Sequence, residues 1–296
     1  MWFRNLSLLS LPADHAIDHA DLELALSAHA LRQPGPLEFE TRGFEPVLTG
    51  GPWLHTSGAA GLFRLDTATR LLPASVLQAA VADRIKDHEL NTGRKPGKRL
   101  RNEFREAALG ELLPRAFVRI GSTAAYLDGH TLVVDSASAR AAEAVATALR
   151  DALGTFPARP LACEASPTLL MSEWLIAGEL PEGFEFGDAV ELKDPSDQST
   201  VVRGVHHDLT TDEIREHARC GKQVTKLGLI FDGRIGFVLD AKLVLRRVRF
   251  LDVVADQLDA QDGASPADLM AAEFALQVLE LRRLFARLDQ VLRFLP

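Results

Sequence analysis

Apolar residues recur along the chain with two different periods, and each change of period marks the boundary of a predicted element. Short apolar runs predict strands over residues 2–11, 44–48 and 61–65, and an apolar repeat of three and four residues predicts helices over residues 18–32 and 74–90. The apolar face of the second helix holds Val76, Leu77, Ala80, Val81, Ile85 and Leu90. A glycine and a Pro-Gly pair then stop this helix before the next one begins.

The third helix covers residues 98–113, so the pattern predicts a helical hairpin placed between elements of a sheet. Beyond it, short apolar runs predict strands over residues 117–120, 124–127, 131–134, 201–205, 224–231, 234–239 and 242–250. Asp128-Gly129 is a typical hairpin turn. Helical periodicity predicts helices over residues 137–153, 168–177 and 210–219. The segment between Gly178 and Gly187 is interpreted as a loop.

The last segment begins with Ser265-Pro266, a helix start, and then spaces its apolar residues alternately four and three apart. These residues are Phe274, Val278, Leu281, Phe285, Leu288, Leu292 and Leu295. Such a seam can pack on its own domain or form a contact between subunits, and the spacing alone leaves both open.

The order of elements predicts an α+β fold with mixed or antiparallel sheets flanked by helices and an inserted basic helical hairpin. Residues 1–73 and 114–160 are expected to form a central sheet domain, and residues 74–113 a helical tip. Residues 161–296 are expected to form a C-terminal α+β base domain, because Pro157 and Pro160 mark a change of composition.

Composition excludes several classes of protein. With 47% hydrophobic and 25% charged residues the chain is neither disordered nor membrane-embedded, and no run approaches the roughly 20 apolar residues of a membrane span. Cys163 and Cys220 are too few and too far apart for a disulfide framework or a zinc-ligand pair. A cytoplasmic location is therefore expected.

Positive charge is concentrated in one region of an acidic chain. Residues 84–119 hold ten Lys and Arg against five Asp and Glu, which makes the region about five charges positive within a chain of net charge -8. Five of these cations fall among eight consecutive positions, namely Arg94, Lys95, Lys98, Arg99 and Arg101. Such a cluster is a candidate phosphate-binding surface.

Basic residues recur in the C-terminal half, at Lys222 and Lys226 and along residues 242–250. In a regular strand Lys242 and Arg246 would share one face and Arg247 and Arg249 the other, so the four cannot all line one surface unless the strand bends or lies at an edge, and only one pair is expected to bind phosphate. No zinc finger, homeodomain or RNP pattern accompanies these charges. Any binding is therefore expected to involve the nucleic-acid backbone, with little sequence preference.

Signals of catalysis are weak. The sequence has no Walker A loop, GxSxG, GxGxxG or HExxH. One alternative function is a metal-dependent hydrolase that uses His206, His207, Asp208 and His217. Another is a plain protein-interaction module that uses the C-terminal seam.

Several segments, in order and at compatible spacing over residues 1–256, resemble the bacterial recombination-associated protein RdgC family. They read WFRNL, LPASV, LLPRAF, LVVDSASA, VELKDP, DLTTDEI, GKQVTKL and FLDVV. The resemblance implies a homodimer that closes into a ring with a basic inner surface, through which duplex DNA passes. It also implies restraint of RecA-promoted recombination, association with the nucleoid, and no catalytic activity, metal or cofactor. Preference between double- and single-stranded DNA stays open.

The resemblance assigns roles to individual residues. Arg94 and Arg115 match DNA-contacting positions, and Phe117 matches the aromatic residue at the contact that closes the ring, although its residue type alone would favour the core. His206-His207 stand where the family tends to carry two lysines. The full set of expected DNA-binding residues is Arg94, Lys95, Lys98, Arg99, Arg101, Arg115, Arg119, Lys222 and Lys226.

Overall fold

A single antiparallel sheet of 12 strands runs through the protein. The structure is a computed structural model that describes residues 2–197, 200–205, 212–255 and 265–295 of the chain. From one edge to the other, its strands are β10 (Val201–Val205), β9 (Phe184–Lys193), β11 (Gln223–Phe231), β12 (Ile235–Asp240), β13 (Leu245–Phe250), β1 (Leu6–Ser10), β6 (Thr131–Asp135), β5 (Phe117–Asp128), β4 (Ala60–Leu71) and β2 (Glu40–Glu45). Two short strands join this path from the side, β3 (His55–Ser57) at β4 and β7 (Arg159–Pro160) at β1. A separate pair joins β8 (Ala162–Cys163) to β14 (Phe294–Leu295).

The helices begin and end close to their predicted positions, because local capping signals decide their boundaries. They are α1 (His19–Ala28), α2 (Ala74–Thr92), α3 (Lys98–Leu112), α4 (Ala139–Leu153), α5 (Pro167–Ala177), α6 (Asp212–Arg219), α7 (Asp252–Ala255) and α8 (Pro266–Leu292), with a 3₁₀ turn η1 at Leu113–Arg115. Gly93 and Gly154 end α2 and α4 in the left-handed conformation, with φ of 67° and 76°. Ser265 and Asp268 form a capping box at the start of α8.

Two strand predictions were wrong. The two strands expected over residues 117–120 and 124–127 form one strand, β5, whose residues all pair with β4, from Leu71 opposite Phe117 to Ala60 opposite Asp128. Strand β9 was missed, because its glycine at position 187 was interpreted as part of a loop. Gly187 instead allows close approach of β9 to β11, since a Cβ there would lie 2.9 Å from the carbonyl carbon of Gly228.

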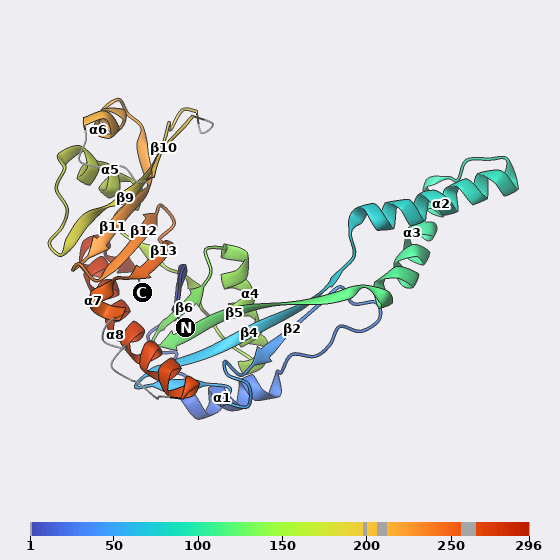
Figure 1. Ribbon diagram of the computed structural model, residues 1–296, viewed down its shortest axis with the longest axis horizontal. Helices are drawn as coiled ribbons and strands as arrows, with labels where there is room; N and C mark the ends of the chain where they lie inside the picture. Colours follow the sequence, from blue (N-terminus) through green and yellow to red (C-terminus); the bar gives the residue numbers. More distant parts are fainter. Residues whose placement is uncertain (1, 198–199, 206–211, 256–264, 296) are drawn as a thin grey trace.

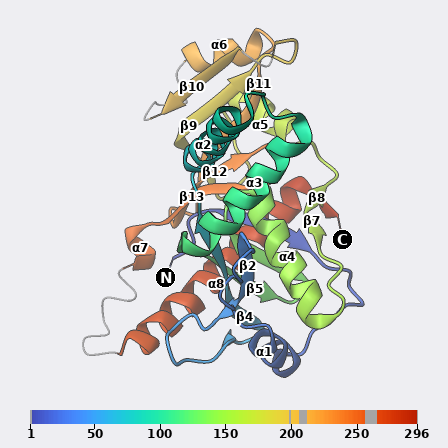
Figure 2. The same ribbon diagram turned by 90° about the vertical axis from the view of Figure 1, so that its right-hand side faces the viewer.

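The molecule is elongated and curved (Figure 1). Strands β4 and β5 extend from the body as an arm, and α2 and α3, here called the tip, lie at its far end. Strands β9–β13 lie at the opposite end, with α5 and α8 packed on one of their faces. The other face of these strands is turned toward the concave side of the molecule (Figures 1 and 2).

The C-terminal seam belongs to the hydrophobic core of the chain itself. Phe274, Val278, Leu281, Leu288 and Leu292 are all at most 2% exposed and pack with side chains of α5 and of strands β9–β13. The interpretation that α8 packs on its own chain is therefore confirmed. The apolar face proposed for a protein-interaction module is covered in this structure.

The tip, by contrast, has little core of its own. Among the residues of α2 and α3, only Ala108 is buried, and Val76 and Leu90 on the predicted apolar face of α2 are 45% and 74% exposed. In chain order α2 and α3 lie between the paired strands β4 and β5. The division into three domains stays a prediction.

Candidate nucleic-acid interface

The five cations of the basic run, here called the tip cluster, lie around the turn between α2 and α3. Arg94 and Lys95 lie in the turn, and Lys98, Arg99 and Arg101 lie in the first turn of α3. Gly97 precedes the helix without a side-chain cap, and no acidic residue occurs in the first turn. The N-terminus of α3 therefore combines free backbone N–H groups with three cations.

All five side chains of the tip cluster are exposed. Arg99 forms an ion pair with Glu103 at 3.1 Å, and Arg101 Nε donates to the carbonyl oxygen of Pro96 at 3.1 Å. Arg94, Lys95 and Lys98 make no ion pair within the described part of the chain. These side chains are thus free to contact an external anion.

Arg115, Phe117 and Arg119 lie where the arm meets the tip, and all three are exposed. Phe117 is 85% exposed and lies opposite Leu71 in the β4–β5 register, so the two side chains share a face of the arm. Leu71 is itself 44% exposed. The interpretation of Phe117 as a core residue is therefore wrong, and its role in a subunit contact stays a prediction.

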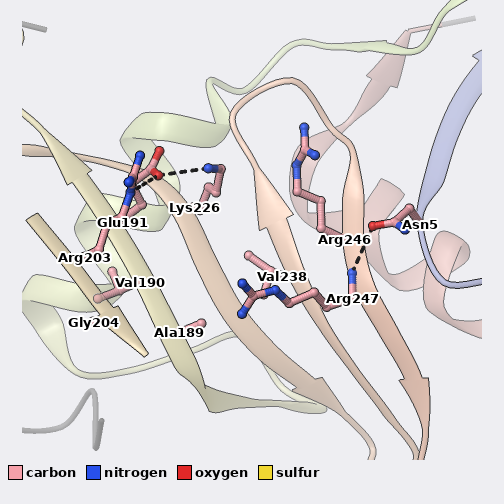
Figure 3. A pocket seen from close by; sticks show the side chains of 10 residues that line it. All are labelled: Asn5, Ala189, Val190, Glu191, Arg203, Gly204, Lys226, Val238, Arg246 and Arg247. Atoms are coloured by element: carbon pink, nitrogen blue, oxygen red, sulfur yellow. Dashed lines mark hydrogen bonds and ion pairs between the residues drawn. The ribbon is translucent and has the colours of Figure 1, made fainter. Parts of the chain in front are cut away.

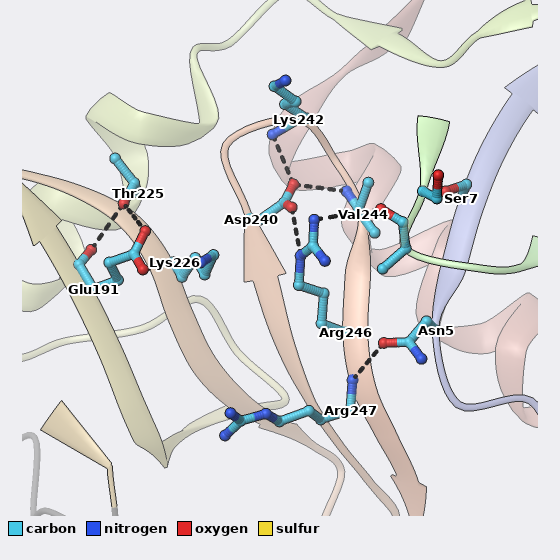
Figure 4. A network of polar contacts seen from close by, with 12 residues as sticks. Asn5, Ser7, Glu191, Thr225, Lys226, Asp240, Lys242, Val244, Arg246 and Arg247 are labelled. Atoms are coloured by element: carbon cyan, nitrogen blue, oxygen red, sulfur yellow. Dashed lines mark hydrogen bonds and ion pairs between the residues drawn. The ribbon is translucent and has the colours of Figure 1, made fainter. Parts of the chain in front are cut away.

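A second basic surface, here called the inner face, occupies the uncovered side of β9–β13 (Figure 3). Glu191 on β9 is paired in register with Arg203 on β10 and with Lys226 on β11. Its carboxylate accepts hydrogen bonds from both at 2.9 Å (Figure 3) and from Thr225 at 3.1 Å (Figure 4). Lys193 Nζ lies 3.8 Å away. Three cations thus surround one carboxylate.

Glu191 is only 5% exposed, and this burial by itself raises the pKa of its carboxyl group. The hydrogen bonds from Lys226, Arg203 and Thr225 outweigh burial and lower that pKa to about 2. Glu191 is therefore ionised at neutral pH, and the surface around it keeps an excess of positive charge.

A β-bulge in β13 brings further arginines to the inner face. Arg247 has a φ of 52°, and the pairing of β12 with β13 shifts at this point, so two residues of β13 face one of β12. Arg246 and Arg247 both line a hollow of about 430 Å³ that Arg203 and Lys226 also line. The opposite faces expected for a regular strand therefore do not apply to these two arginines, because the bulge is the kind of bend that brings both to one surface.

The arginines of the bulge differ in their local partners. Arg246 Nε donates to Asp240 at 2.8 Å (Figure 4), whereas the side chain of Arg247 extends over Val238 into the hollow (Figure 3). Arg247 and Arg249 line a neighbouring hollow of about 670 Å³ on the same strands. Arg203 and Lys193 were missed by sequence reasoning, because neither belongs to a basic run and only strand pairing brings them to Glu191.

The structure does not unite all the predicted binding residues. The tip cluster, Arg115 and Arg119 belong to the tip and the arm, and Lys226 belongs to the inner face at the other end of the molecule. Lys222 lies in the turn before β11 and does not line the hollow. Two separate basic surfaces result.

The metal-site alternative falls mostly outside the described residues, which exclude His206, His207 and Asp208. The fourth candidate, His217, lies in α6. Within the residues that the structure covers, no three His, Cys, Asp or Glu side chains come together in a group that could hold a metal ion. The described helices also include none that is long and apolar enough to cross a membrane.

Comparison with known proteins extends the resemblance to nearly the whole chain. The family model described as "Putative exonuclease, RdgC" matches residues 1–294, so the match continues beyond residue 256, where the motifs that carry the resemblance end. A recombination-associated protein RdgC from Laribacter hongkongensis is 40% identical over 292 residues, covering 97% of both chains. Proteins of the same name from Xanthomonas campestris pv. campestris and Xanthomonas axonopodis pv. citri are 36% and 37% identical, covering 99% of this chain and 98% of their own. The chain therefore belongs to the RdgC family of recombination-associated proteins.

Proposed function

We propose that this protein binds the phosphate backbone of duplex DNA without sequence preference, as a homodimer closed into a ring, and thereby restrains RecA-promoted recombination. The observation that carries the proposal is the N-terminus of α3. Its first turn has no acidic residue and no side-chain cap, but has three exposed cations.

The physical argument concerns the helix dipole. The N-terminus of a helix carries partial positive charge, so cations in the first turn of α3 are unfavourable by about 0.3–1 kcal/mol each. An arrangement that violates a local rule in this way is typical of a functional site. A bound phosphate makes the net electrostatic interaction at this helix end favourable, because it accepts hydrogen bonds from the free N–H groups and is attracted by Lys98, Arg99 and Arg101.

The inner face supplies a second surface for the same duplex. Lys193, Arg203 and Lys226 outnumber Glu191, and Arg247 extends into the same hollow. Because this face is turned toward the concave side of the curved molecule, two copies related by a two-fold axis could enclose DNA between them. The exposed pair of Phe117 and Leu71 on the arm is an apolar surface suited to the contact that closes such a ring.

Restraint of recombination follows from occupancy of DNA. A protein that contacts only phosphates binds anywhere on the chromosome, which accounts for the proposed nucleoid association, and it covers DNA that strand exchange requires. No direct contact with RecA is needed for this effect. The same surfaces should bind single-stranded DNA more weakly than duplex DNA, since single strands release fewer counterions per phosphate.

The decisive experiment measures duplex affinity over a salt series for Arg94→Ala and Arg115→Ala. Each variant should weaken binding to all sequences alike and flatten the slope of log K against log salt by about 0.9. Arg42→Ala is the matched control, because Arg42 is an arginine of the same sheet that pairs with Glu40 on β2. Unchanged slopes for Arg94→Ala and Arg115→Ala would exclude both residues from the interface.

Ring closure needs its own measurement. A closed ring should stay on circular DNA at high salt and leave linear DNA through its ends, whereas an open clamp should leave both alike. Complete failure to retard duplex DNA at low salt would instead favour a plain protein-interaction function.

The matching family model carries the description of an exonuclease, and such an activity is the alternative to a non-catalytic role. Incubation of end-labelled duplex and single-stranded DNA with Mg²⁺ or Mn²⁺ tests it directly. We expect the label to stay at full length; release of mononucleotides by the purified protein, abolished by a His206→Ala and Asp208→Ala double substitution, would establish the metal-dependent hydrolase.

A further inference from the structure

Arg70 lies at the end of β4, where the arm meets the tip, and its side chain contacts four carbonyl groups. One terminal nitrogen, Nη1, donates to the carbonyl oxygens of Leu113, Pro114 and Ala116 at 3.1, 3.2 and 3.3 Å. The other, Nη2, donates to the carbonyl oxygen of Pro34 at 3.0 Å. A single guanidinium therefore joins the arm, the end of the tip and the loop that precedes β2.

The carbonyls of Leu113 and Pro114 lie at the end of η1, where the last carbonyls of a helix have few hydrogen bonds within it and the C-terminus carries partial negative charge. The carbonyl oxygen of Leu113 also accepts a hydrogen bond from the Ala116 N–H at 3.1 Å. Arg70 supplies both the donors and the positive charge at the end of α3 and η1. A lysine could not do the same, because one ammonium on a flexible stem does not present the planar set of donors that reaches carbonyls on two sides.

The segment held by Arg70 carries two of the residues that the proposed function requires. Arg115 lies between the carbonyls of Pro114 and Ala116, and Phe117 follows directly. Among the residues of α2 and α3 only Ala108 is buried, and at the junction itself Leu113 is 1% exposed, so Arg70 acts together with the packing of this one leucine. Arg70 Nε is buried without a partner among the described residues, so the guanidinium faces protein rather than solvent.

We infer that Arg70 is a positioning residue: it fixes the orientation of Arg115 relative to the arm, and acts on DNA only through that residue. The inference rests on the proposed function, because it names the residue that aligns the DNA-contacting groups. It differs from a direct contact, in which Arg70 would itself neutralise a phosphate.

A double-mutant cycle between Arg70→Met and Arg115→Ala tests the inference on the full-length protein. From a slope of about −0.9 per phosphate, loss of the Arg115 contact should weaken duplex binding about eightfold at 0.1 M salt. Arg70→Met should weaken it by a similar factor, and the double variant should lose about eightfold in total rather than the roughly 60-fold of independent sites. Additive losses would overturn the inference, because they indicate separate contributions.

Conservative replacements add a second criterion. Arg70→Lys should bind as poorly as Arg70→Met, whereas Arg115→Lys, which keeps a phosphate-binding charge, should bind almost as well as the unaltered protein. Wild-type affinity in Arg70→Lys would overturn the inference. Arg42→Ala again controls for the loss of one positive charge on the same sheet.

Hydrogen exchange gives a readout that does not depend on DNA. The Ala116 N–H donates to the carbonyl oxygen of Leu113 at 3.1 Å, inside the segment that Arg70 holds. Its exchange should accelerate in Arg70→Met and not in Arg42→Ala. The two hypotheses fail on different results. Absence of DNA binding by the unaltered protein would refute the proposed function, and unchanged exchange of the Ala116 N–H in Arg70→Met would refute the positioning role.

Discussion

Replacement of Glu191 by Gln should change stability and DNA affinity in opposite directions. Glu191 is the buried carboxylate at the centre of the inner face, bonded to Arg203 and Lys226 at 2.9 Å. Glutamine keeps the shape of the side chain but removes the negative charge that holds the surrounding cations. The structure would lose an ion-pair network while the inner face would gain positive charge.

The magnitude of the stability change follows from the pKa. The carboxyl pKa falls from 4.5 to about 2 on folding, which corresponds to about 3 kcal/mol of stability at pH 7. Because the folded pKa is lowered, this contribution is present above pH 4.5 and is lost as the pH falls toward 2. At pH 3 about 1.4 kcal/mol should remain. The stability difference between the wild-type protein and Glu191→Gln should shrink accordingly.

The affinity change follows from the charge balance. Each cation that no longer pairs with residue 191 can neutralise a phosphate. It should then steepen the slope of log K against log salt by about 0.9 and tighten duplex binding about eightfold at 0.1 M salt. Urea unfolding followed by circular dichroism at pH 7 and pH 3 measures the first effect, and duplex titration over a salt series measures the second.

Glu280→Gln is the matched control. Glu280 is 1% exposed and is bonded to Arg234 at 2.6 and 2.9 Å, but it lies on α8, on the covered side of the sheet. Its replacement should cost about 3–5 kcal/mol and leave DNA affinity unchanged. Weaker DNA binding by Glu191→Gln, or equal effects of the two variants on DNA, would refute the assignment of the inner face to DNA.

Two further predictions concern the bulge and the arm. Arg247→Ala should flatten the salt slope for duplex binding by about 0.9, because Arg247 extends into the hollow of the inner face; an unchanged slope in the same titration would remove it from the interface. Phe117→Ala should weaken dimerisation more than a hundredfold in analytical ultracentrifugation, since two copies would together forgo burial worth about 3 kcal/mol. The melting temperature of the monomer should stay the same, because Phe117 is 85% exposed. A large drop in the melting temperature would show that Phe117 packs in the core.

Local signals were sufficient to predict the helices. Gly93 and Gly154 end α2 and α4, and Ser265 begins α8, because a cap depends only on residues within about one turn of it. The basic run that became the tip cluster was likewise visible, since its five cations are near neighbours along the chain. Family membership also followed from short motifs whose order the chain itself contains.

Features made by pairing between distant residues could not be obtained in this way. Glu191 meets Arg203 and Lys226 only because β9 lies between β10 and β11, and β9 itself was interpreted as a loop. The bulge at Arg247 interrupts the alternation of its strand and depends on pairing with β12, so residue parity alone could not tell that Arg246 and Arg247 line one hollow.

The sequence by itself determined the helix boundaries, the location of the basic run and the family, because each depends on residues close together in the chain. Only the tertiary structure decided that Phe117 is exposed, that Arg70 contacts four carbonyl groups where the arm meets the tip, and that the inner face carries net positive charge. Exposure and charge balance are properties of surfaces assembled from several strands. Hydrophobicity alone predicts burial, and it fails on an arm that extends away from the core.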